Sequence, residues 1–143
     1  DENKVSPIDK FTPLYKNSKN IKIVQDAKFA STNEVRGTSY RSRIDDPKYQ
    51  FAGKTGTAQV KKITKRDREL DLKTFEIPYE ERDHALYVAY GPYKNPRYAV
   101  SVIVEHGGNG STTAAPMAKK LFKLIIDRHE KRQLMNDKKY LEV

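Results

Sequence analysis

A short polar motif at residues 52–59, Ala-Gly-Lys-Thr-Gly-Thr-Ala-Gln, combines residue types that can do chemistry. Lys54 supplies an ammonium group, and the hydroxyls of Thr55 and Thr57 flank Gly56, which has no side chain. An ammonium and two hydroxyls can bind a carboxylate, and a backbone N–H such as that of Thr57 can stabilise a developing oxyanion. The motif therefore predicts a site for an extended ligand with an acidic group.

Residues 49–63 mix aromatic, β-branched and threonine residues with two glycines, which is typical of a strand that another chain approaches closely. Because side chains alternate along a strand, Lys54 and Gly56 should share one face, and Thr55 and Thr57 the other. The missing side chain at Gly56 would let a peptide pair with the strand edge. A twist at this glycine would then bring both faces toward one cleft. An ordinary polar edge strand is the simpler alternative.

Other elements must position this strand. Apolar spacing predicts a helix over 20–36 that ends at Gly37. Strands at 85–90 and 98–105 flank the turn-forming residues 91–96 and predict a hairpin.

The last predicted element is a helix over 113–128, preceded by Ser111 and Thr112 as capping residues, with an apolar stripe that should lie on the sheet. The sequence thus predicts an α+β fold, an antiparallel sheet of three strands within 49–106 with covering helices. The remaining segments are predicted to be an irregular lead-in (1–19), a charged excursion (61–83) and a tail (129–143), which either extends the preceding helix or is mobile.

The distribution of charge argues against nucleic acid as a partner. The chain has 143 residues, with 28 Lys and Arg against 19 Asp and Glu, for a formal charge of +9. The most charged stretch, 61–83, nonetheless carries as many acidic as basic residues. Interleaved signs are typical of a solvated surface, so a nucleic-acid module ranks last among the functions considered. The excess positive charge comes mainly from Lys94, Arg97, Lys119, Lys120 and Lys123.

Composition excludes further classes of chemistry. The chain has no cysteine, so a disulfide scaffold, a thiol nucleophile and a thiolate zinc site are ruled out. The three histidines lack metal-ligand spacing, and we expect no metal and no cofactor. No apolar run approaches the roughly 18 residues of a membrane span, so we expect these residues to be soluble. Because the first residue is Asp1, we also expect them to be part of a longer protein.

Several segments resemble the C-terminal part of the transpeptidase domain of class B penicillin-binding proteins, most of all the penicillin-binding protein 2 group. They are AGKTGTAQ, HALYVAYGPYKNPRYAVSVIVEHGGNGS and AAPMAKKLFKLIID, with IVQDAKFASTNEVRGTSY upstream. The resemblance extends over roughly residues 21–127, and its Lys-Thr-Gly motif is one of those known in this class. It implies that the chain is an incomplete piece of a penicillin-binding/β-lactamase-like transpeptidase domain.

The resemblance implies a serine-type D,D-transpeptidase or D-Ala-D-Ala carboxypeptidase, which crosslinks peptidoglycan stem peptides through an acyl-serine and is acylated by β-lactam antibiotics. By the same resemblance, Lys54 assists proton movement and substrate binding. Thr55 and Thr57 bind the terminal carboxylate, the Thr57 N–H contributes to the oxyanion hole, and Gly56 keeps the cleft open. The implied catalytic residues are Lys54 and Thr57, and the implied substrate-binding residues are Thr55, Gly56 and Thr57.

The chain departs from the family pattern in one respect. No serine is followed three residues later by lysine, so the nucleophile and its base are missing. Ser18-Lys19-Asn20 fits a Ser-x-Asn pattern, but it precedes Lys54 by only 36 residues and is interpreted as a chance match. We therefore expect these residues alone to be inactive toward penicillin.

The resemblance also implies a setting for the parent protein. It should be anchored in the bacterial inner membrane with this domain on the periplasmic or outer side, and work in a cell-wall synthesis complex. The alternative function is a non-catalytic module of the same fold that binds peptidoglycan or another protein.

Overall fold

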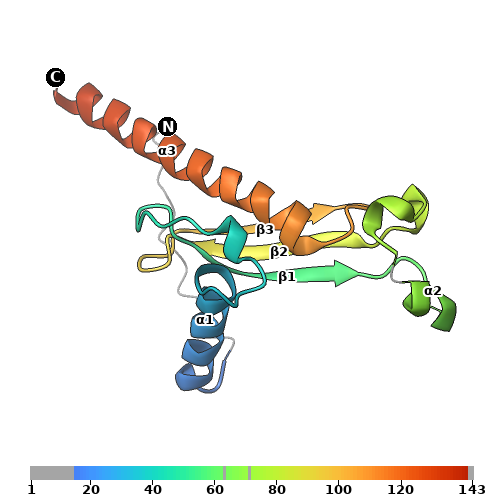
Figure 1. Ribbon diagram of the computed structural model, residues 1–143. Helices are drawn as coiled ribbons and strands as arrows, with labels where there is room; N and C mark the ends of the chain where they lie inside the picture. Colours follow the sequence, from blue (N-terminus) through green and yellow to red (C-terminus); the bar gives the residue numbers. More distant parts are fainter. Residues whose placement is uncertain (1–14, 63, 71, 142–143) are drawn as a thin grey trace.

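A three-stranded antiparallel sheet lies at the centre of the computed structural model, which describes residues 15–62, 64–70 and 72–141 (Figure 1). The strands are β1 (Ala52–Ala58), β2 (His84–Gly91) and β3 (Tyr98–Val104), in the order β1-β2-β3. Helices accompany the sheet, so the predicted α+β fold is confirmed. Within the described residues, β1 and β3 are both edge strands.

The two faces of the sheet differ in burial. Along β2, Ala85, Tyr87 and Ala89 point to one side and are buried. The rings of Phe51 and Phe122 stack in the core at a centroid distance of 5.0 Å. On the opposite face, described apolar residues such as Val88 and Ile103 are 46% and 63% exposed. Helices thus cover one face of the sheet within the described part of the chain.

Helix α1 (Ser18–Asn33) packs its C-terminal end against β1. It begins at Ser18 because the Asn17 side chain accepts a hydrogen bond from the Lys19 N–H, which caps the first turn. It ends at Asn33 because Glu34 adopts an extended conformation. The predicted helix, 20–36, was therefore shifted toward the C-terminus, and the predicted stop at Gly37 lies in the turn that follows.

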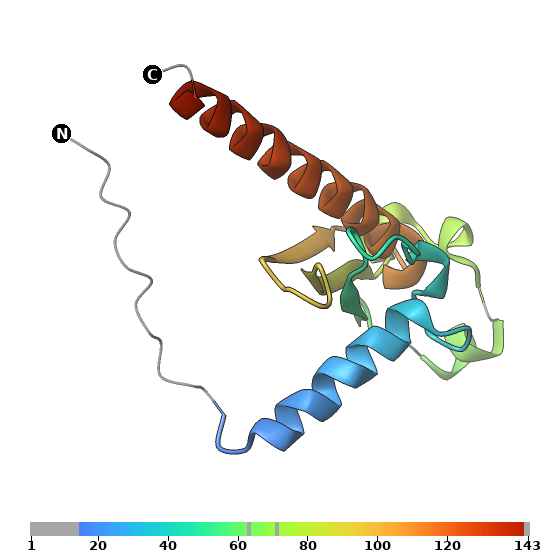
Figure 2. The ribbon, with the colours of Figure 1, turned by 90° about the vertical axis from the view of Figure 1, so that its left-hand side faces the viewer.

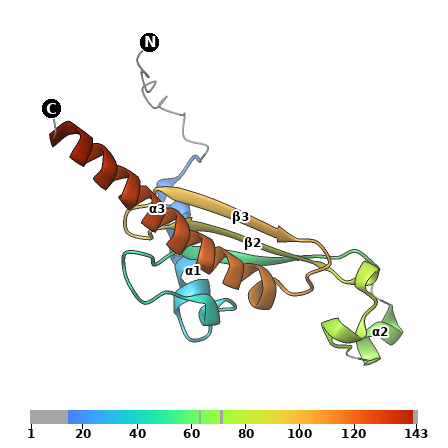
Figure 3. The same ribbon diagram turned by 90° about the horizontal axis from the view of Figure 1, so that it is seen from above.

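Helix α3 (Ala115–Leu141) follows a π-helical turn, η4 (Gly110–Ala114). Its first part lies along the sheet and its C-terminal part extends past the strands (Figure 3). The Asn109 side chain accepts from the Ser111 N–H at 2.8 Å, so Asn109 caps this turn and not Ser111 or Thr112. The helix also continues through most of the segment 129–143, where a tail was predicted. No Gly or Pro follows Pro116, and this segment is rich in helix-forming Lys, Arg, Glu and Leu.

The charged excursion, 61–83, contains short helical pieces that the sequence analysis did not anticipate. They are α2 (Lys65–Leu70) and the 3₁₀ turns η2 (Thr74–Glu76) and η3 (Tyr79–Glu81). Of the predicted lead-in, residues 1–14 lie outside the described residues, and α1 begins at Ser18. Figure 2 shows α1 and α3 diverging from the sheet. No described helix has the length and apolar character needed to cross a membrane.

Candidate active-site edge

The Lys-Thr-Gly motif lies on β1, in antiparallel register with β2. Thr55 and Thr57 are paired with buried residues of β2, on the face that the helices cover. Lys54 is paired with the exposed residue Val88 and lies on the other face with Gly56. The strand therefore alternates its side chains as the sequence predicted.

The end of α1 fixes which backbone groups of β1 lie at its free edge. The Gly53 N–H donates to Thr32 Oγ1 at 3.0 Å, and the Phe51 carbonyl accepts from Asn33 Nδ2 at 2.9 Å. These backbone groups therefore point toward α1 and not toward β2. In an antiparallel strand, the N–H and C=O groups of successive residues point to opposite sides. The backbone groups of every second residue of β1 therefore point to this edge.

Thr55 and Thr57 are the next two residues whose N–H and C=O groups face this edge. The Lys54 side chain bends across the strand, so that its Nζ donates to the Thr55 carbonyl oxygen at 2.8 Å and lies 3.3 Å from Thr55 Oγ1. The bend brings an ammonium from one face beside a hydroxyl from the other. Among the residues that the structure describes, none bonds to the Thr57 hydroxyl.

Gly56 has one close neighbour on its side-chain side. A Cβ atom added to this residue would meet a single atom within 4 Å, Leu86 Cβ, at a tight 3.3 Å. The strand therefore has a gap between Lys54 and the exposed residue Thr57, where a ligand can lie against the main chain.

Lys54 also lines a hollow of about 520 Å³ between β1 and α1. The hollow contains the cationic side chains of Lys28 and Arg36 as well as Lys54, and one carboxylate, Glu34. Its charge therefore favours an anionic group. The other lining residues come from α1 and the turn after it: Val24, Ala27, Ala30, Ser31, Gly37 and Thr38.

A buried chain of hydroxyl groups supports the strand immediately before Lys54. Thr32 Oγ1 lies 2.9 Å from the Tyr87 hydroxyl, which lies 3.1 Å from Ser39 Oγ. Ser39 Oγ donates its proton to the Ser31 carbonyl at 3.0 Å, so it can accept a hydrogen bond from the Tyr87 hydroxyl. The Tyr87 oxygen can in turn accept one from the Thr32 hydroxyl. Thr32 Oγ1 then remains an acceptor for the Gly53 N–H.

Burial raises the pKa of the Tyr87 hydroxyl, which keeps it protonated. A Cβ atom at Gly53 would lie 2.5 Å from this hydroxyl, so only glycine lets the strand pass so close. No sequence pattern predicts this row of hydroxyl groups, because its members are far apart in sequence and ordinary in type.

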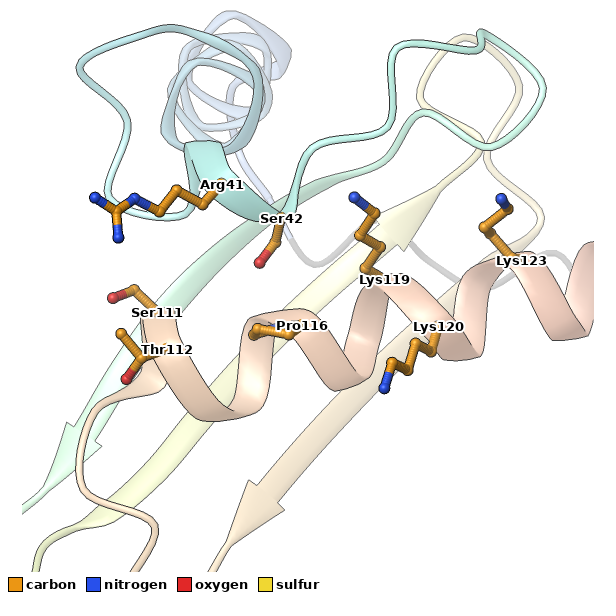
Figure 4. Close-up of a pocket in the computed structure, with 8 residues that line it drawn as sticks. All are labelled: Arg41, Ser42, Ser111, Thr112, Pro116, Lys119, Lys120 and Lys123. Atoms are coloured by element: carbon orange, nitrogen blue, oxygen red, sulfur yellow. The ribbon is translucent and has the colours of Figure 1, made fainter. Parts of the chain in front are cut away.

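A second hollow, of about 490 Å³, lies beside the start of α3 and is lined by four cationic side chains, Arg41, Lys119, Lys120 and Lys123. Figure 4 shows Lys119 and Lys123 on one side of α3 and Lys120 on the other, with Arg41 directed away from them. Ser111 Oγ donates to the Asn109 side chain. These groups do not converge on one point, so the candidate site is the β1 edge.

The Ser-x-Asn segment and the histidines lie away from the β1 edge. Ser18, Lys19 and Asn20 form the exposed start of α1, at the end of the helix away from the sheet (Figure 1). His84 Nδ1 accepts from the His106 N–H at 2.9 Å, so residues distant in sequence meet at the end of the sheet. Across the described part of the chain, no group of three side chains could hold a metal ion.

Comparison with known proteins identifies the family. The chain matches the family described as the penicillin binding protein transpeptidase domain over residues 15–123. It therefore belongs to the transpeptidase-domain family of penicillin-binding proteins, as its motifs suggested.

Its relatives include peptidoglycan D,D-transpeptidases named MrdA. That of Salmonella typhimurium is 37% identical over 105 residues, which make up 73% of this chain and 16% of the relative. That of Haemophilus influenzae is 38% identical over 108 residues, 76% of this chain and 15% of the relative. The chain thus spans about one sixth of the length of these relatives.

Solved structures of penicillin-binding protein 2 share the fold. The complex between penicillin-binding protein 2 and MreC from Helicobacter pylori has a TM-score of 0.61 at 30% identity, covering 84% of this chain and 20% of that chain. Pseudomonas aeruginosa penicillin-binding protein 2 in complex with WCK 5153 has a TM-score of 0.60 at 30% identity, covering 82% of this chain and 23% of that chain. The predicted likeness to this group is confirmed.

Proposed function

We propose that the complete protein containing this chain is a serine D,D-transpeptidase that crosslinks peptidoglycan stem peptides. In this proposal the chain contributes one wall of the active site, the β1 edge with Lys54, Thr55, Gly56 and Thr57. One observation carries it. In a chain of this family, the Lys54 ammonium reaches the Thr55 hydroxyl at an open strand edge.

The proposed reaction begins with a serine contributed by another part of the protein. Its oxygen attacks the carbonyl of the penultimate D-Ala, the terminal D-Ala leaves with a proton on its nitrogen, and an acyl-serine ester remains. The amine of a second stem peptide then takes the acyl group and releases the serine. The Thr57 N–H stabilises the oxyanion of each addition step.

The other residues of the wall bind and orient the substrate. The hydroxyls of Thr55 and Thr57 donate to the terminal carboxylate, and the Lys54 ammonium supplies positive charge beside it. Lys54 also assists the movement of the serine proton. The carboxylate of a β-lactam occupies the same position, so these antibiotics acylate the serine. Gly56 leaves room for either ligand.

The proposal extends to where the protein works. The relatives' names describe peptidoglycan transpeptidases, which act outside the cytoplasm, and one structural neighbour is a complex with MreC. We therefore place the complete protein at the bacterial inner membrane, with this domain on the periplasmic or outer side and in a cell-wall synthesis complex.

A second candidate is a non-catalytic module of this fold that binds peptidoglycan or a protein. The uncovered part of the β1 edge supports it, since an ammonium and hydroxyls at a strand edge can bind a peptide without any covalent step. The two functions differ in one measurement, covalent labelling of the complete protein by a fluorescent penicillin. Labelling that is blocked by unlabelled penicillin and reversed by cleavage of the ester supports the transpeptidase. Binding of peptidoglycan without labelling supports the module.

A further inference from the structure

The C-terminal end of α1 covers the free edge of β1 over the N-terminal half of the strand. Two consecutive helix residues, Asn33 and Thr32, bond to two consecutive edge positions, the Phe51 carbonyl and the Gly53 N–H. Phe51 and Gly53 are both buried. A ligand strand that adds to this edge therefore meets its first position not bonded to α1 at Thr55, where the carbonyl oxygen accepts from the Lys54 side chain.

The closed end is also the positively charged end. The Lys54 ammonium lies 2.8 Å from the Thr55 carbonyl oxygen, at the first edge position that α1 does not bond. The adjoining hollow contains Lys28 and Arg36 against the single carboxylate of Glu34. A negatively charged group of the ligand is therefore favoured where the edge meets α1.

These two features together set the direction of a ligand. A peptide that pairs antiparallel with β1 has its C-terminal end toward α1, where a free carboxylate meets Lys54. A peptide that continued past this point would need the positions that Thr32 and Asn33 occupy.

We propose that Thr32 and Asn33 determine substrate specificity by restricting the β1 edge to peptides whose free carboxyl terminus lies at Lys54 and Thr55. The inference rests on the proposed function and explains its preference for chain ends over internal peptide bonds. The hydroxyl chain through Tyr87 and Ser39 holds Thr32 in place, which makes the closed end rigid.

Kinetics of the complete protein test this. The measured quantity is the ratio of two second-order acylation rates, one for a peptide with a free terminal D-Ala and one for the same peptide extended by one residue. We expect the unaltered protein to prefer the free end by roughly 100-fold, the scale on which a site rejects an added group. In the double variant Thr32→Ala, Asn33→Ala the ratio should fall roughly tenfold.

Two matched variants make the result specific. Asn20→Ala, on the exposed first turn of α1, should keep the ratio, and so should Thr32→Ser, which retains the hydroxyl. A general distortion of the site would slow both peptides equally. An unchanged ratio in the double variant would therefore overturn the inference.

Hydrogen exchange provides a measurement that needs no variant. In the ligand-free complete protein, the Gly53 amide should be protected, while the Thr55 and Thr57 amides exchange faster and become protected when the free-ended peptide binds. A Gly53 amide that exchanges as fast as that of Thr57 contradicts closure by α1. Failure of penicillin labelling would instead contradict the proposed function, and the protection of Gly53 would still report on closure.

Discussion

Gly110 lies directly against the backbone of Gly56. A Cβ atom on Gly110 would be 2.6 Å from the Gly56 carbonyl oxygen and 2.5 Å from that of Leu86. The turn that starts α3 therefore rests on the main chain of β1 and β2 at the middle of the motif. This contact couples the position of α3 to the shape of the candidate site.

The contact between Gly110 and Gly56 predicts that substitutions at these two glycines affect stability and acylation differently. Gly110→Ala should destabilise the fold by about 1–3 kcal/mol, because backbone atoms cannot move aside as a flexible side chain would. Gly56→Ala should destabilise the fold less, because its Cβ meets a single side-chain atom, Leu86 Cβ, at 3.3 Å, and Leu86 has to shift by only a few tenths of an ångström. It should nevertheless slow acylation, because the methyl group occupies the gap. Denaturant unfolding and penicillin labelling of the complete protein check both outcomes.

Lys54→Ala should reduce acylation of the complete protein by a fluorescent penicillin by roughly 100-fold or more, the usual contribution of a proton-transfer group. The variant also removes positive charge beside the ligand carboxylate. Lys94→Ala is the matched control, since Lys94 is an exposed cation in the turn between β2 and β3. Near-normal labelling of the Lys54 variant would contradict the role proposed for this residue.

The Thr57 hydroxyl is predicted to contribute to carboxylate binding. Thr57→Val keeps the side-chain shape but removes the hydroxyl, and should weaken recognition by roughly 1–3 kcal/mol, the cost of losing a buried polar partner. Thr57→Ser should restore most of the loss. The dissociation constant that precedes acylation, obtained from the dependence of the labelling rate on penicillin concentration, is the informative measurement. Equal constants for the Val and Ser variants would refute the contact.

Asp127 links α3 to Tyr49 and should make stability depend on pH. The Tyr49 hydroxyl donates to Asp127 Oδ1 at 2.5 Å, and this bond, with a smaller contribution from Lys48, lowers the pKa of the carboxyl group. Because the pKa is lower in the folded state, the carboxylate stabilises the fold fully at pH values above the pKa of the unfolded chain, about 3.9. This stabilisation is lost as the pH falls through the lower, folded value.

Thermal unfolding of Asp127→Asn in the complete protein checks this. The melting temperature should lie below that of the unaltered protein at neutral pH, and the difference should shrink as the solution is acidified below pH 4 or so. Tyr49→Phe removes the main cause of the shift and should behave similarly. A difference that stays constant down to strongly acidic pH would show that the carboxylate does not contribute in this way.

The sequence predicted the hairpin and the alternation of Lys54 and Thr55 because both follow from the period of a strand and from local turn residues. It could not predict the contact between Thr32 and Gly53, which depends on how α1 packs and not on any pattern within the helix. Element ends were misplaced for local reasons, such as the extended conformation of Glu34. The length of α3 was underestimated because its end lacks an apolar stripe but retains good helix formers.

The uncovered face of the sheet has a practical consequence for anyone who prepares these residues in isolation. The side chains of Val88 and Ile103 are exposed to water, and within the described sheet β3 and the part of β1 from Thr55 onward have no further strand beside them. At high concentration, the exposed apolar faces of different copies should associate, and their edge strands should pair with one another, which leads to aggregation. Dilute samples, or charged substitutions at Val88 and Ile103, should delay that precipitation.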